Sequence, residues 1–378
     1  MLRRLRPALF WLHLVIGVAA SLVVIMLCVT GALLAAELPV TRWADRQLVS
    51  SPAPGAAPLS LEALAPHLEA GLGDRAPSHL TLGRNPAEPV VASVSRRRVV
   101  FDPFTGASLG GGAVGVRGFF HGVMKAHRWF ALEGGARGVG KAVVGAATLG
   151  FVALVLTGLV LWVPRRWRWS SVRPIFWFRR GKTGKARDHN WHHVLGLWLW
   201  LPLLVLAVTG AGIAYAWVRD GLVALGGETE ASARPASRPA DEDASLSARL
   251  TGVDAAVARV VAREPDWRQL TLTVPGDAES SVVITADHGN GRQPQHRVSY
   301  EVDRRTLELV RRTPWEDEPS ARRIRGVIRF GHTGEMFGLL GMALAALASV
   351  GGAVLGFTGV TLSWHRFVAW RRRRQRSG

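Results

Sequence analysis

The sequence predicts an α-helical membrane protein with four transmembrane helices, arranged as an internal duplication, and two small α+β domains outside the membrane. Four long apolar stretches contain no Asp, Glu, Lys or Arg, and they cover residues 7–36, 142–163, 194–218 and 336–364. Each is longer than the roughly 18 apolar residues that indicate a transmembrane helix. Two long polar segments separate the first stretch from the second and the third from the fourth.

The distribution of charge predicts the orientation. The net charge is +19, and 18 of the 47 Lys and Arg residues lie at the N-terminus, in the loop at 165–191 and at the C-terminus, with Asp188 as their one acidic neighbour. Because short cytoplasmic flanks are enriched in Lys and Arg, we expect both termini and this loop to be cytoplasmic and the polar segments to face outward. Basic clusters also occur in nucleic-acid-binding proteins. Here they adjoin apolar spans, so we expect membrane lipid as a partner and no nucleic acid.

The first apolar stretch exceeds the roughly 7–15 residues of a signal-peptide core, so we expect an uncleaved membrane anchor. It contains Cys28, the single cysteine of the sequence. One cysteine excludes an internal disulfide, a c-type haem attachment and a cysteine-ligated metal cluster.

A spacing that occurs twice is the main sign of the duplication. The pattern His-x3-Gly-x12-Thr-Gly begins at His13 in the first apolar stretch and at His192 in the third. The second and fourth stretches also carry a Thr-Gly dipeptide, so the dipeptides stand at residues 30–31, 157–158, 209–210 and 358–359. Since the second and fourth helices run inward, we expect their dipeptides near the cytoplasm and the other two near the outside.

The polar segments repeat as well. The first begins with a helix that Ser60 caps, continues with apolar stretches near Leu80, 90–94 and 99–101, and ends in a turn at 102–106. The second has a helix at 254–263 and strands at 269–274, 281–287 and 298–309. Asp102 and Asp303 occupy matching positions. Each segment is therefore predicted to be one helix against a small antiparallel sheet, and residues 228–244 a mobile linker.

Histidines at two levels predict two haem sites. Seventeen residues, about 25 Å of helix, separate His13 from Thr30, so one histidine pair lies level with the inner glycines and the other with the outer glycines. Ionisable residues in a membrane span are functional candidates, and two histidines beside two glycines suit a bis-histidine b-type haem. The predicted inner site contains His13, His192, Gly158 and Gly359, and the predicted outer site contains His127, His332, Gly31 and Gly210.

The outer site repeats less regularly. His127 precedes its Thr-Gly by thirty residues and His332 by twenty-six. The difference is close to one helical turn, and the glycine-rich stretch at 134–140 could absorb it as a loop.

Other assignments stay open. His193 or His365 is an alternative inner ligand, and His121 an alternative outer one. The Thr-Gly dipeptides could serve close helix packing alone. A zinc site needs three or four clustered ligands, which the residues around His189 could provide, but such a site would not explain His13.

Several motifs resemble those of the PepSY-associated transmembrane-helix proteins. They are Ala126-His-Arg-Trp-Phe130, Asn190-Trp-His-His-Val-Leu-Gly196 and Gly331-His-Thr-Gly-Glu-Met-Phe-Gly338, together with the four Thr-Gly helix ends. The polar segments resemble PepSY modules, particularly at Phe101-Asp-Pro-Phe-Thr-Gly106. Asp303-Arg-Arg-Thr306 in the second segment lacks the glycine, which leaves open a different turn there.

The resemblance covers nearly the whole chain and implies a bacterial inner-membrane protein with periplasmic PepSY-like domains. It implies a di-haem b protein that carries electrons to a periplasmic acceptor, with ferric siderophore the preferred one. Because no glycine-rich dinucleotide fingerprint follows a predicted strand, we expect a separate electron donor on the cytoplasmic side. Arg96, Arg97 and Arg98 could attract an acidic chelate, although a solvated strand end is the simpler interpretation.

Two other functions remain open from the sequence. The protein could be a PepSY-based binding or regulatory protein without redox activity, acting on a protease or peptide. It could also be a transporter whose histidines relay protons.

The predicted segments are transmembrane helix 1 (1–38), PepSY-like domain 1 (39–118), a periplasmic histidine segment with transmembrane helix 2 (119–164), the basic cytoplasmic loop (165–191), transmembrane helix 3 (192–218), a periplasmic linker with PepSY-like domain 2 (219–325), transmembrane helix 4 (326–365) and a basic cytoplasmic tail (366–378).

Overall fold

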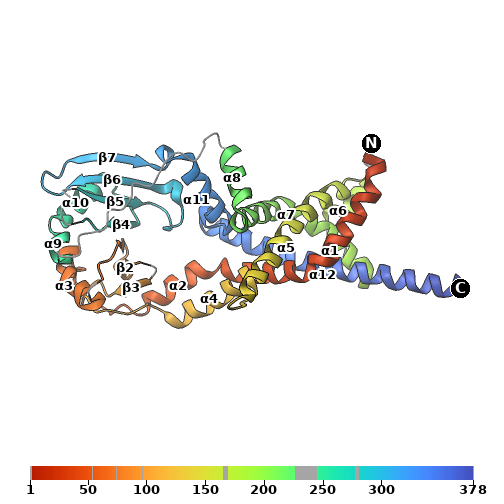
Figure 1. Ribbon diagram of the computed structural model, residues 1–378, viewed down its shortest axis with the longest axis horizontal. Helices are drawn as coiled ribbons and strands as arrows, with labels where there is room; N and C mark the ends of the chain where they lie inside the picture. The colour runs from red at the N-terminus through yellow and green to blue at the C-terminus, as the bar shows by residue number, and fades with distance from the viewer. Residues whose placement is uncertain are drawn as a thin grey trace. The chain divides into compact units, whose positions relative to one another are not determined.

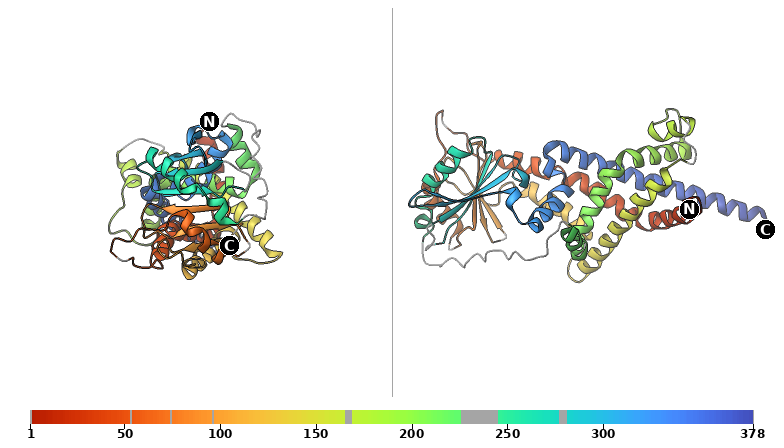
Figure 2. Two further views of the ribbon diagram at one scale, coloured as in Figure 1. Left: turned by 90° about the vertical axis from the view of Figure 1, so that its left-hand side faces the viewer. Right: turned by 90° about the horizontal axis from the view of Figure 1, so that it is seen from above.

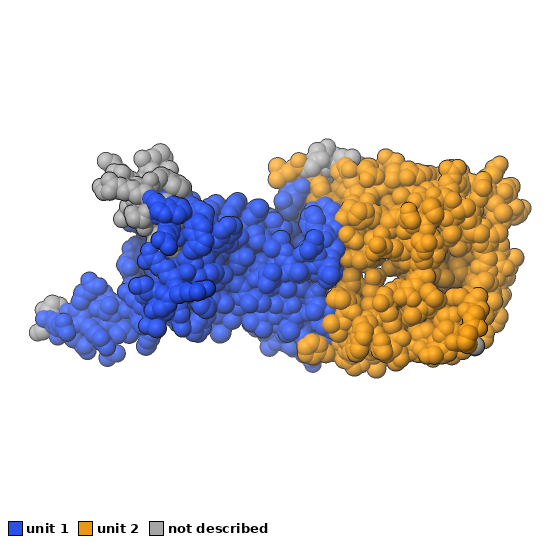
Figure 3. Space-filling view, turned by 180° about the vertical axis from the view of Figure 1, so that it is seen from behind, with its two compact units in different colours: residues 1–36, 120–222, 327–378 blue, residues 37–119, 223–326 orange. Residues whose placement is uncertain are grey.

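The computed structural model describes residues 2–52, 54–73, 75–95, 97–164, 169–225, 245–276 and 281–377. The chain divides into two compact units, which Figure 3 colours separately. Unit 1 comprises Met1–Ala36, Phe120–Leu222 and Val327–Gly378, and unit 2 comprises Glu37–Phe119 and Val223–Gly326. Both halves of the sequence therefore contribute to each unit. The predicted linker at 228–244 lies outside the described residues.

Unit 1 contains four long helices, α1 (Leu2–Leu34), α5 (Ala136–Trp162), α7 (Gly184–Ala214) and α12 (Gly338–Ser377). Helices α1 and α7 each pack against both α5 and α12, so α1 and α7 are diagonal to one another in the bundle (Figure 1). All four helices are long and apolar enough to cross a membrane. The prediction of a multi-pass protein with four spans is therefore confirmed.

Shorter helices precede or follow these spans. They are α2 (Glu37–Arg46), α4 (Val114–Trp129), α6 (Trp169–Phe176), α8 (Ala216–Leu225) and α11 (Ser320–His332). The third and fourth predicted spans differ from the structure at both ends. Helix α7 begins within the predicted basic loop and ends at Ala214, and α12 begins at Gly338 and continues through the predicted tail. Lys and Arg are good helix formers, so a basic flank readily extends a helix.

Small residues let the four long helices approach one another. Ala20, Val24, Cys28 and Ala147 form a buried cluster between helices. Gly352 lies directly against the Cys28 sulfur, where a Cβ atom would be 2.7 Å from it. Close packing over small residues is a usual way for helices to associate in membranes.

Side-chain contacts also join the basic ends of the helices. The buried carboxylate of Asp188 on α7 accepts hydrogen bonds from Arg187 and from the Thr361 hydroxyl on α12. The Arg366 guanidinium of α12 lies 4.8 Å from the centroid of the Phe10 ring on α1. The one acidic residue of the basic segments thus connects two helices.

Unit 2 contains a single antiparallel sheet of seven strands in the order β3-β2-β1-β4-β5-β6-β7. The strands are β1 (His79–Gly83), β2 (Val90–Val94), β3 (Arg97–Phe101), β4 (Gln269–Thr273), β5 (Ser281–Asp287), β6 (Arg297–Asp303) and β7 (Leu309–Pro314). The sequence predicts a small sheet for each polar segment, whereas in the structure β1 pairs with β4 and joins them, with Leu80 opposite Leu272 (Figure 2).

The two polar segments share one hydrophobic core. Helices α3 (Leu61–Leu72), α9 (Leu246–Leu250) and α10 (Val253–Arg263) pack with the sheet around residues that include Leu64, Leu80, Phe101, Val260, Leu272, Ile284 and Tyr300. Burying apolar side chains from both segments together gives a larger core than either sheet could form alone.

The equivalent helices of the two segments cap each other. The Asp254 carboxylate of α10 accepts the backbone N–H of Leu61 at the start of α3, at 2.8 Å. The Glu62 carboxylate of α3 accepts the backbone N–H of Gly252 before α10, at 3.0 Å. Both acids neutralise unpaired N–H groups at helix N-termini. Each acid is the second residue of its helix, which confirms the equivalence of the segments.

The turn that ends each segment is also the same. The Asp102 carboxylate accepts the N–H groups of Phe104 and Thr105, and the Asp303 carboxylate accepts those of Arg305 and Thr306. Gly106 and Leu307 both adopt left-handed backbone conformations, with φ of 71° and 57°. The missing glycine therefore does not change the turn, and Leu307 takes a conformation that costs a residue with a Cβ roughly 1–2 kcal/mol.

Candidate functional site

Two of the predicted ligands meet between the diagonal helices α1 and α7. The Nδ1 atom of His13 lies 2.9 Å from the Thr157 hydroxyl of α5, and the Nδ1 atom of His192 lies 3.0 Å from the Thr358 hydroxyl of α12. The two imidazole rings face across the bundle with their centroids 6.4 Å apart and their planes at 87°. We call these residues the inner histidine pair.

The other two predicted ligands meet in the same way near the other ends of these helices. The Nδ1 atom of His127 lies 2.8 Å from the Thr30 hydroxyl of α1, and that of His332 lies 3.0 Å from the Thr209 hydroxyl of α7. The ring centroids of this outer histidine pair are 6.3 Å apart and the planes meet at 58°. All four predicted histidines are thus in the predicted pairs.

Each threonine hydroxyl also contacts its own helix, four residues back. The hydroxyls of Thr157 and Thr358 lie 2.7 and 2.8 Å from the carbonyls of Ala153 and Val354. Those of Thr30 and Thr209 make the equivalent bonds at 2.7 and 2.6 Å. A hydroxyl has one proton, so a threonine that donates it to a carbonyl can only accept from the histidine.

The threonine hydroxyl determines the histidine tautomer. The carbonyl three residues before each threonine also lies beside the facing imidazole, and it belongs to Leu27, Leu154, Leu206 and Leu355. Because each threonine donates its proton to a carbonyl of its own helix, the Nδ1 atom that contacts the hydroxyl must be the donor. In all four histidines we therefore assign the proton to Nδ1, which leaves the lone pair of Nε2 for a metal.

The glycine after each threonine leaves room for the edge of the histidine ring. A Cβ atom on Gly158 or Gly359 would lie 3.3 or 3.5 Å from the Cε1 atom of the inner histidine on the neighbouring helix. A Cβ atom on Gly31 or Gly210 would lie 3.6 or 3.1 Å from the Cε1 atom of the outer histidine. The sequence suggests space for a macrocycle at these glycines, whereas in the structure the nearest neighbour is the imidazole at three of them and the Ser349 hydroxyl, at 3.4 Å, at Gly31.

The separation of the rings suits a metal ion between them. Two metal–nitrogen bonds of about 2 Å place the centroids of two opposed imidazoles about 6 Å apart. Among the described residues, no group of three or more His, Cys, Asp or Glu side chains could hold a metal ion. Each level therefore supplies two nitrogen ligands from the protein.

The alternative histidines make other contacts. His193 stacks on His189 with ring centroids 4.2 Å apart and bonds that residue's carbonyl through Nδ1. Its ring centroid also lies 6.4 Å from that of His192, but none of the threonine hydroxyls that the structure describes contacts its Nδ1 atom. His365 is exposed and lines a hollow beside the basic end of α12. His121 is exposed on α4, whereas the outer pair is half-buried. The structure assigns none of the three to a Thr-Gly dipeptide.

Two features of the site were not part of the sequence prediction. The first is the leucine that precedes each Thr-Gly by three residues, so that all four helices carry Leu-x-x-Thr-Gly. The second is the break before α5 and α12, which puts His127 and His332 at the ends of separate helices rather than on the spans. The leucine repeat is visible in the sequence, and the breaks follow from Phe130 and Gly334 with positive φ.

The outer arginines have different environments. Arg97 is exposed, Arg96 lies outside the described residues, and Arg98 lies 3.6 Å from the Asp45 carboxylate. Burial, followed by repulsion from Arg117, lowers the pKa of Arg98 to about 10, although Asp45 acts in the opposite direction. Arg98 is thus part of a crowded set of cations in unit 2.

Comparison with known proteins supports one family. The family described as the PepSY-associated TM region matches residues 10–366, which is nearly the whole chain. No curated protein matches the chain. The match includes α5, α7, most of α1 and α12, and all four paired histidines. The protein therefore belongs to the PepSY-associated transmembrane-region family.

Proposed function

We propose that this protein binds two b-type haems, one at each histidine pair, and carries electrons across the membrane. The observation that carries the proposal is the fourfold His–Thr-Gly contact. It leaves each Nε2 atom without a proton, in a ring whose centroid is 6.3 or 6.4 Å from that of its partner.

The ligand set favours haem over a simple metal ion. Structural zinc sites take four protein ligands and catalytic ones take three, whereas each level here supplies two histidines within the described residues. Two histidines match the two axial positions of a haem. Bound haem iron would supply reversible one-electron transfer at each level.

The threonines act on the histidines as positioning groups. They hold the imidazole orientation and fix the Nδ1 proton. A hydrogen bond accepted from Nδ1–H makes Nε2 a more basic ligand and so favours the oxidised metal. The half-buried position of these residues in the bundle also limits the access of water.

The spacing of the two pairs suits a path across a bilayer. Thr30, which holds the outer histidine His127, follows His13 by seventeen residues on α1, about 25 Å along the helix. The hydrocarbon core of a bilayer is about 30 Å thick, so the two levels would lie near its opposite faces. The basic flanks of the spans favour a cytoplasmic inner level and a periplasmic outer level.

We further propose that the periplasmic acceptor is a ferric siderophore. The resemblance to di-haem siderophore reductases supports this acceptor. One electron would convert bound Fe(III) to Fe(II), which oxygen-rich chelators hold far less tightly, so reduction would release the iron. The electron would come from a separate donor on the cytoplasmic side.

Spectra of histidine variants test the proposal. The purified protein from haem-sufficient cells should be red and show a b-type Soret band that shifts on reduction with dithionite. His13→Ala and His192→Ala should each remove the same haem, and His127→Ala and His332→Ala should each remove the other. Loss of different haems by two members of one pair would refute the pairing.

Other histidines provide matched controls. His121→Ala, His193→Ala and His365→Ala remove the same side chain away from the four Thr-Gly contacts. All three should keep both haems. Loss of a haem in one of these variants, with retention in a variant of the paired histidines, would overturn the ligand assignment.

A further inference from the structure

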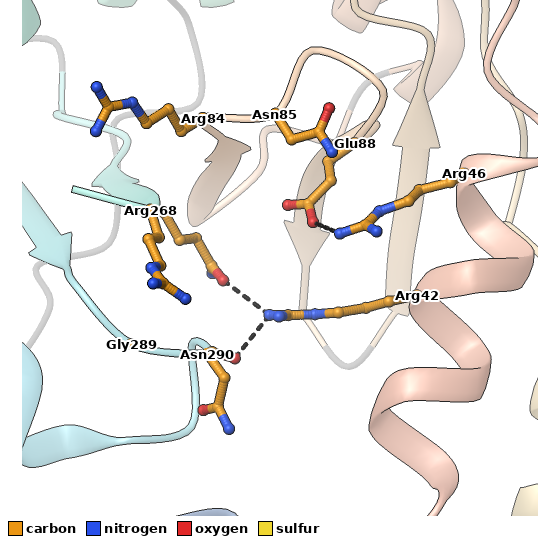
Figure 4. Close-up of a pocket in the computed structure, with 9 residues that line it drawn as sticks. Arg42, Arg46, Arg84, Asn85, Glu88, Arg268, Gly289 and Asn290 are labelled. Carbon is orange, nitrogen blue, oxygen red and sulfur yellow. Dashed lines mark hydrogen bonds and ion pairs between the residues drawn. The ribbon is translucent and has the colours of Figure 1, made fainter. Parts of the chain in front are cut away.

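Unit 2 contains a pocket that the electron-transfer proposal does not use. It has a volume of about 450 Å³, within the range of small-molecule sites. Figure 4 shows Arg42 and Arg46 extending from α2, Arg42 toward Asn290 and Arg46 toward Glu88. Gly83 at the end of β1 is paired with Gln269 at the start of β4, so the pocket lies where the two repeats join.

The pocket is strongly basic. Four arginines line it, Arg42, Arg46, Arg84 and Arg268, against one acidic side chain, that of Glu88. Glu88 forms an ion pair with Arg46. In the described part of the chain, no carboxylate lies within ion-pair distance of the other three arginines. The pocket therefore has an excess of positive charge.

Two of these three arginines are held by neutral acceptors. The Arg42 guanidinium donates to the Gln269 side-chain oxygen at 3.1 Å and to the Asn290 carbonyl at 2.8 Å. The Arg84 guanidinium donates to the Pro265 carbonyl at 2.7 Å. Hydrogen bonds to carbonyls orient a guanidinium without neutralising it, so the charges remain available to a ligand.

Glycines make room for these side chains. A Cβ atom on Gly291, whose φ is 73°, would clash with the Gln269 side chain and would lie 2.9 Å from the Arg42 guanidinium. A Cβ atom on Gly83 would clash with the Glu88 side chain. The loops on both sides of the sheet junction thus approach the charged groups closely, which preorganises the pocket.

More cations surround α2. Arg98 interacts electrostatically with Arg117, Arg292 and Arg42, and the balancing acid is Asp45. The positive potential therefore extends beyond the four lining residues. A low-dielectric hollow with walls of one sign concentrates ions of the opposite sign.

We propose that this pocket binds a small molecule with two or more oxyanion groups, either carboxylates or phosphates. Guanidinium groups bind both kinds of group through paired hydrogen bonds. A ligand with several oxyanions can contact arginines from α2 and from both repeats at once. The site lies wholly within unit 2 and needs no haem.

Calorimetric titration of the full-length protein in detergent tests this proposal. The probes are citrate, pyrophosphate and acetate. Citrate or pyrophosphate should bind more tightly than acetate, and Arg268→Gln and Arg42→Gln should each weaken that binding about tenfold or more. Arg259→Gln removes the same charge from an exposed position on α10 and should leave binding unchanged.

The relative affinities of the probes distinguish the two classes of ligand. Preference for citrate assigns the site to polycarboxylates, and preference for pyrophosphate assigns it to phosphate compounds. The proposal is wrong if neither probe binds more tightly than acetate, or if Arg268→Gln, whose side chain supports no described contact, binds as tightly as the unchanged protein. Haem content measured on the same samples tests the electron-transfer proposal independently of ligand binding.

Discussion

The two halves of the chain build equivalent contacts with different connections. In the first half, six residues that include Phe130 and Ala131, both with positive φ, connect the helix of His127 to α5. In the second half, the helix of His332 connects to α12 through a short turn between Gly334 and Gly338. The distances between histidine and threonine nevertheless stay within 2.8 to 3.0 Å in all four contacts. The duplication has kept the histidine contact and varied the connection.

Glycines accommodate both connections. Gly140 near the start of α5 lies against the Trp129 carbonyl, and Gly341 near the start of α12 lies against the Gly334 carbonyl, each too close to allow a Cβ atom. A histidine helix can therefore fold back against its span in both halves. The four-residue difference in spacing between the halves is absorbed here, outside the histidine contacts.

The largest expected effect, loss of the outer haem, concerns Gly210 and Gly31 beside the outer histidine pair. Gly210→Val should abolish haem binding at the outer level, because even its Cβ atom would lie 3.1 Å from Cε1 of His332. Gly31→Ala, whose Cβ atom would lie 3.6 Å from His127, should retain this haem. Haem stoichiometry measures both. Full occupancy in Gly210→Val would mean that the glycine contact does not control the site.

A smaller effect tests whether the halves hold the inner histidines equally. Thr157→Val and Thr358→Val remove the hydroxyl that accepts from Nδ1–H and leave both histidine ligands, so the haem should remain. Without this hydrogen bond the histidine is a less basic ligand, which should raise the midpoint potential of the inner haem. The rise should be less than about 59 mV, the value for a tenfold change in a one-electron equilibrium constant.

Potentiometric titration followed at the Soret band measures this shift. Thr157→Ser keeps the hydroxyl and is the matched control. Equal shifts from the two valine variants would support equivalent halves, whereas an unchanged or lower potential would contradict the assigned direction of the hydrogen bond.

The two turn aspartates test the sheet repeats. Burial raises the pKa of Asp102, but hydrogen bonds from Ser50, Phe104 and Thr105 outweigh it and lower the pKa overall. The stability from the charged form is therefore present above the ordinary Asp pKa of about 3.9 and is lost as the pH falls through the folded value.

Asp102→Asn should destabilise unit 2 by about 1–3 kcal/mol at neutral pH, since the buried carboxylate also accepts hydrogen bonds from the N–H and the hydroxyl of Ser50. Asp303→Asn should have a smaller effect, because Asp303 is only half-buried and its carboxylate has, within the described residues, no contact equivalent to that with Ser50. Thermal unfolding followed by circular dichroism compares the variants. Equal losses would mean that the extra contacts of Asp102 do not contribute.

The smallest effect concerns the left-handed residue of the turn. Leu307→Gly should stabilise the protein by up to about 1 kcal/mol, because glycine adopts positive φ without steric cost but gains entropy when unfolded. Gly106→Leu should destabilise it more, since a Cβ atom there would also clash with the His67 ring. The same unfolding assay measures both, and a destabilised Leu307→Gly variant would show that the leucine packing outweighs the strain.

Much of this arrangement follows from local patterns in the sequence. Apolar length indicated the four spans, and the repeated spacing from His13 and His192 indicated the inner pair. The helix at 254–263 and the cap at Ser60 also match the structure, because capping and amphipathic periodicity act within a few residues.

Other features depend on contacts between distant residues. No local pattern in the sequence indicates that Leu80 pairs with Leu272. The sequence therefore predicted two separate sheets, whereas the structure contains one. The short helices that carry His127 and His332 were missed, since their ends depend on backbone turns before α5 and α12. The arginine pocket was missed because α2 and loops from both repeats form it.

The central claim is that each histidine pair binds one haem. A pyridine haemochrome assay on purified protein from haem-sufficient cells measures haem type and amount per chain directly. The account predicts two b-type haems per chain. One haem would contradict the equivalence of the two levels, and colourless protein would contradict the electron-transfer function and favour a binding or regulatory role for the PepSY-like segments.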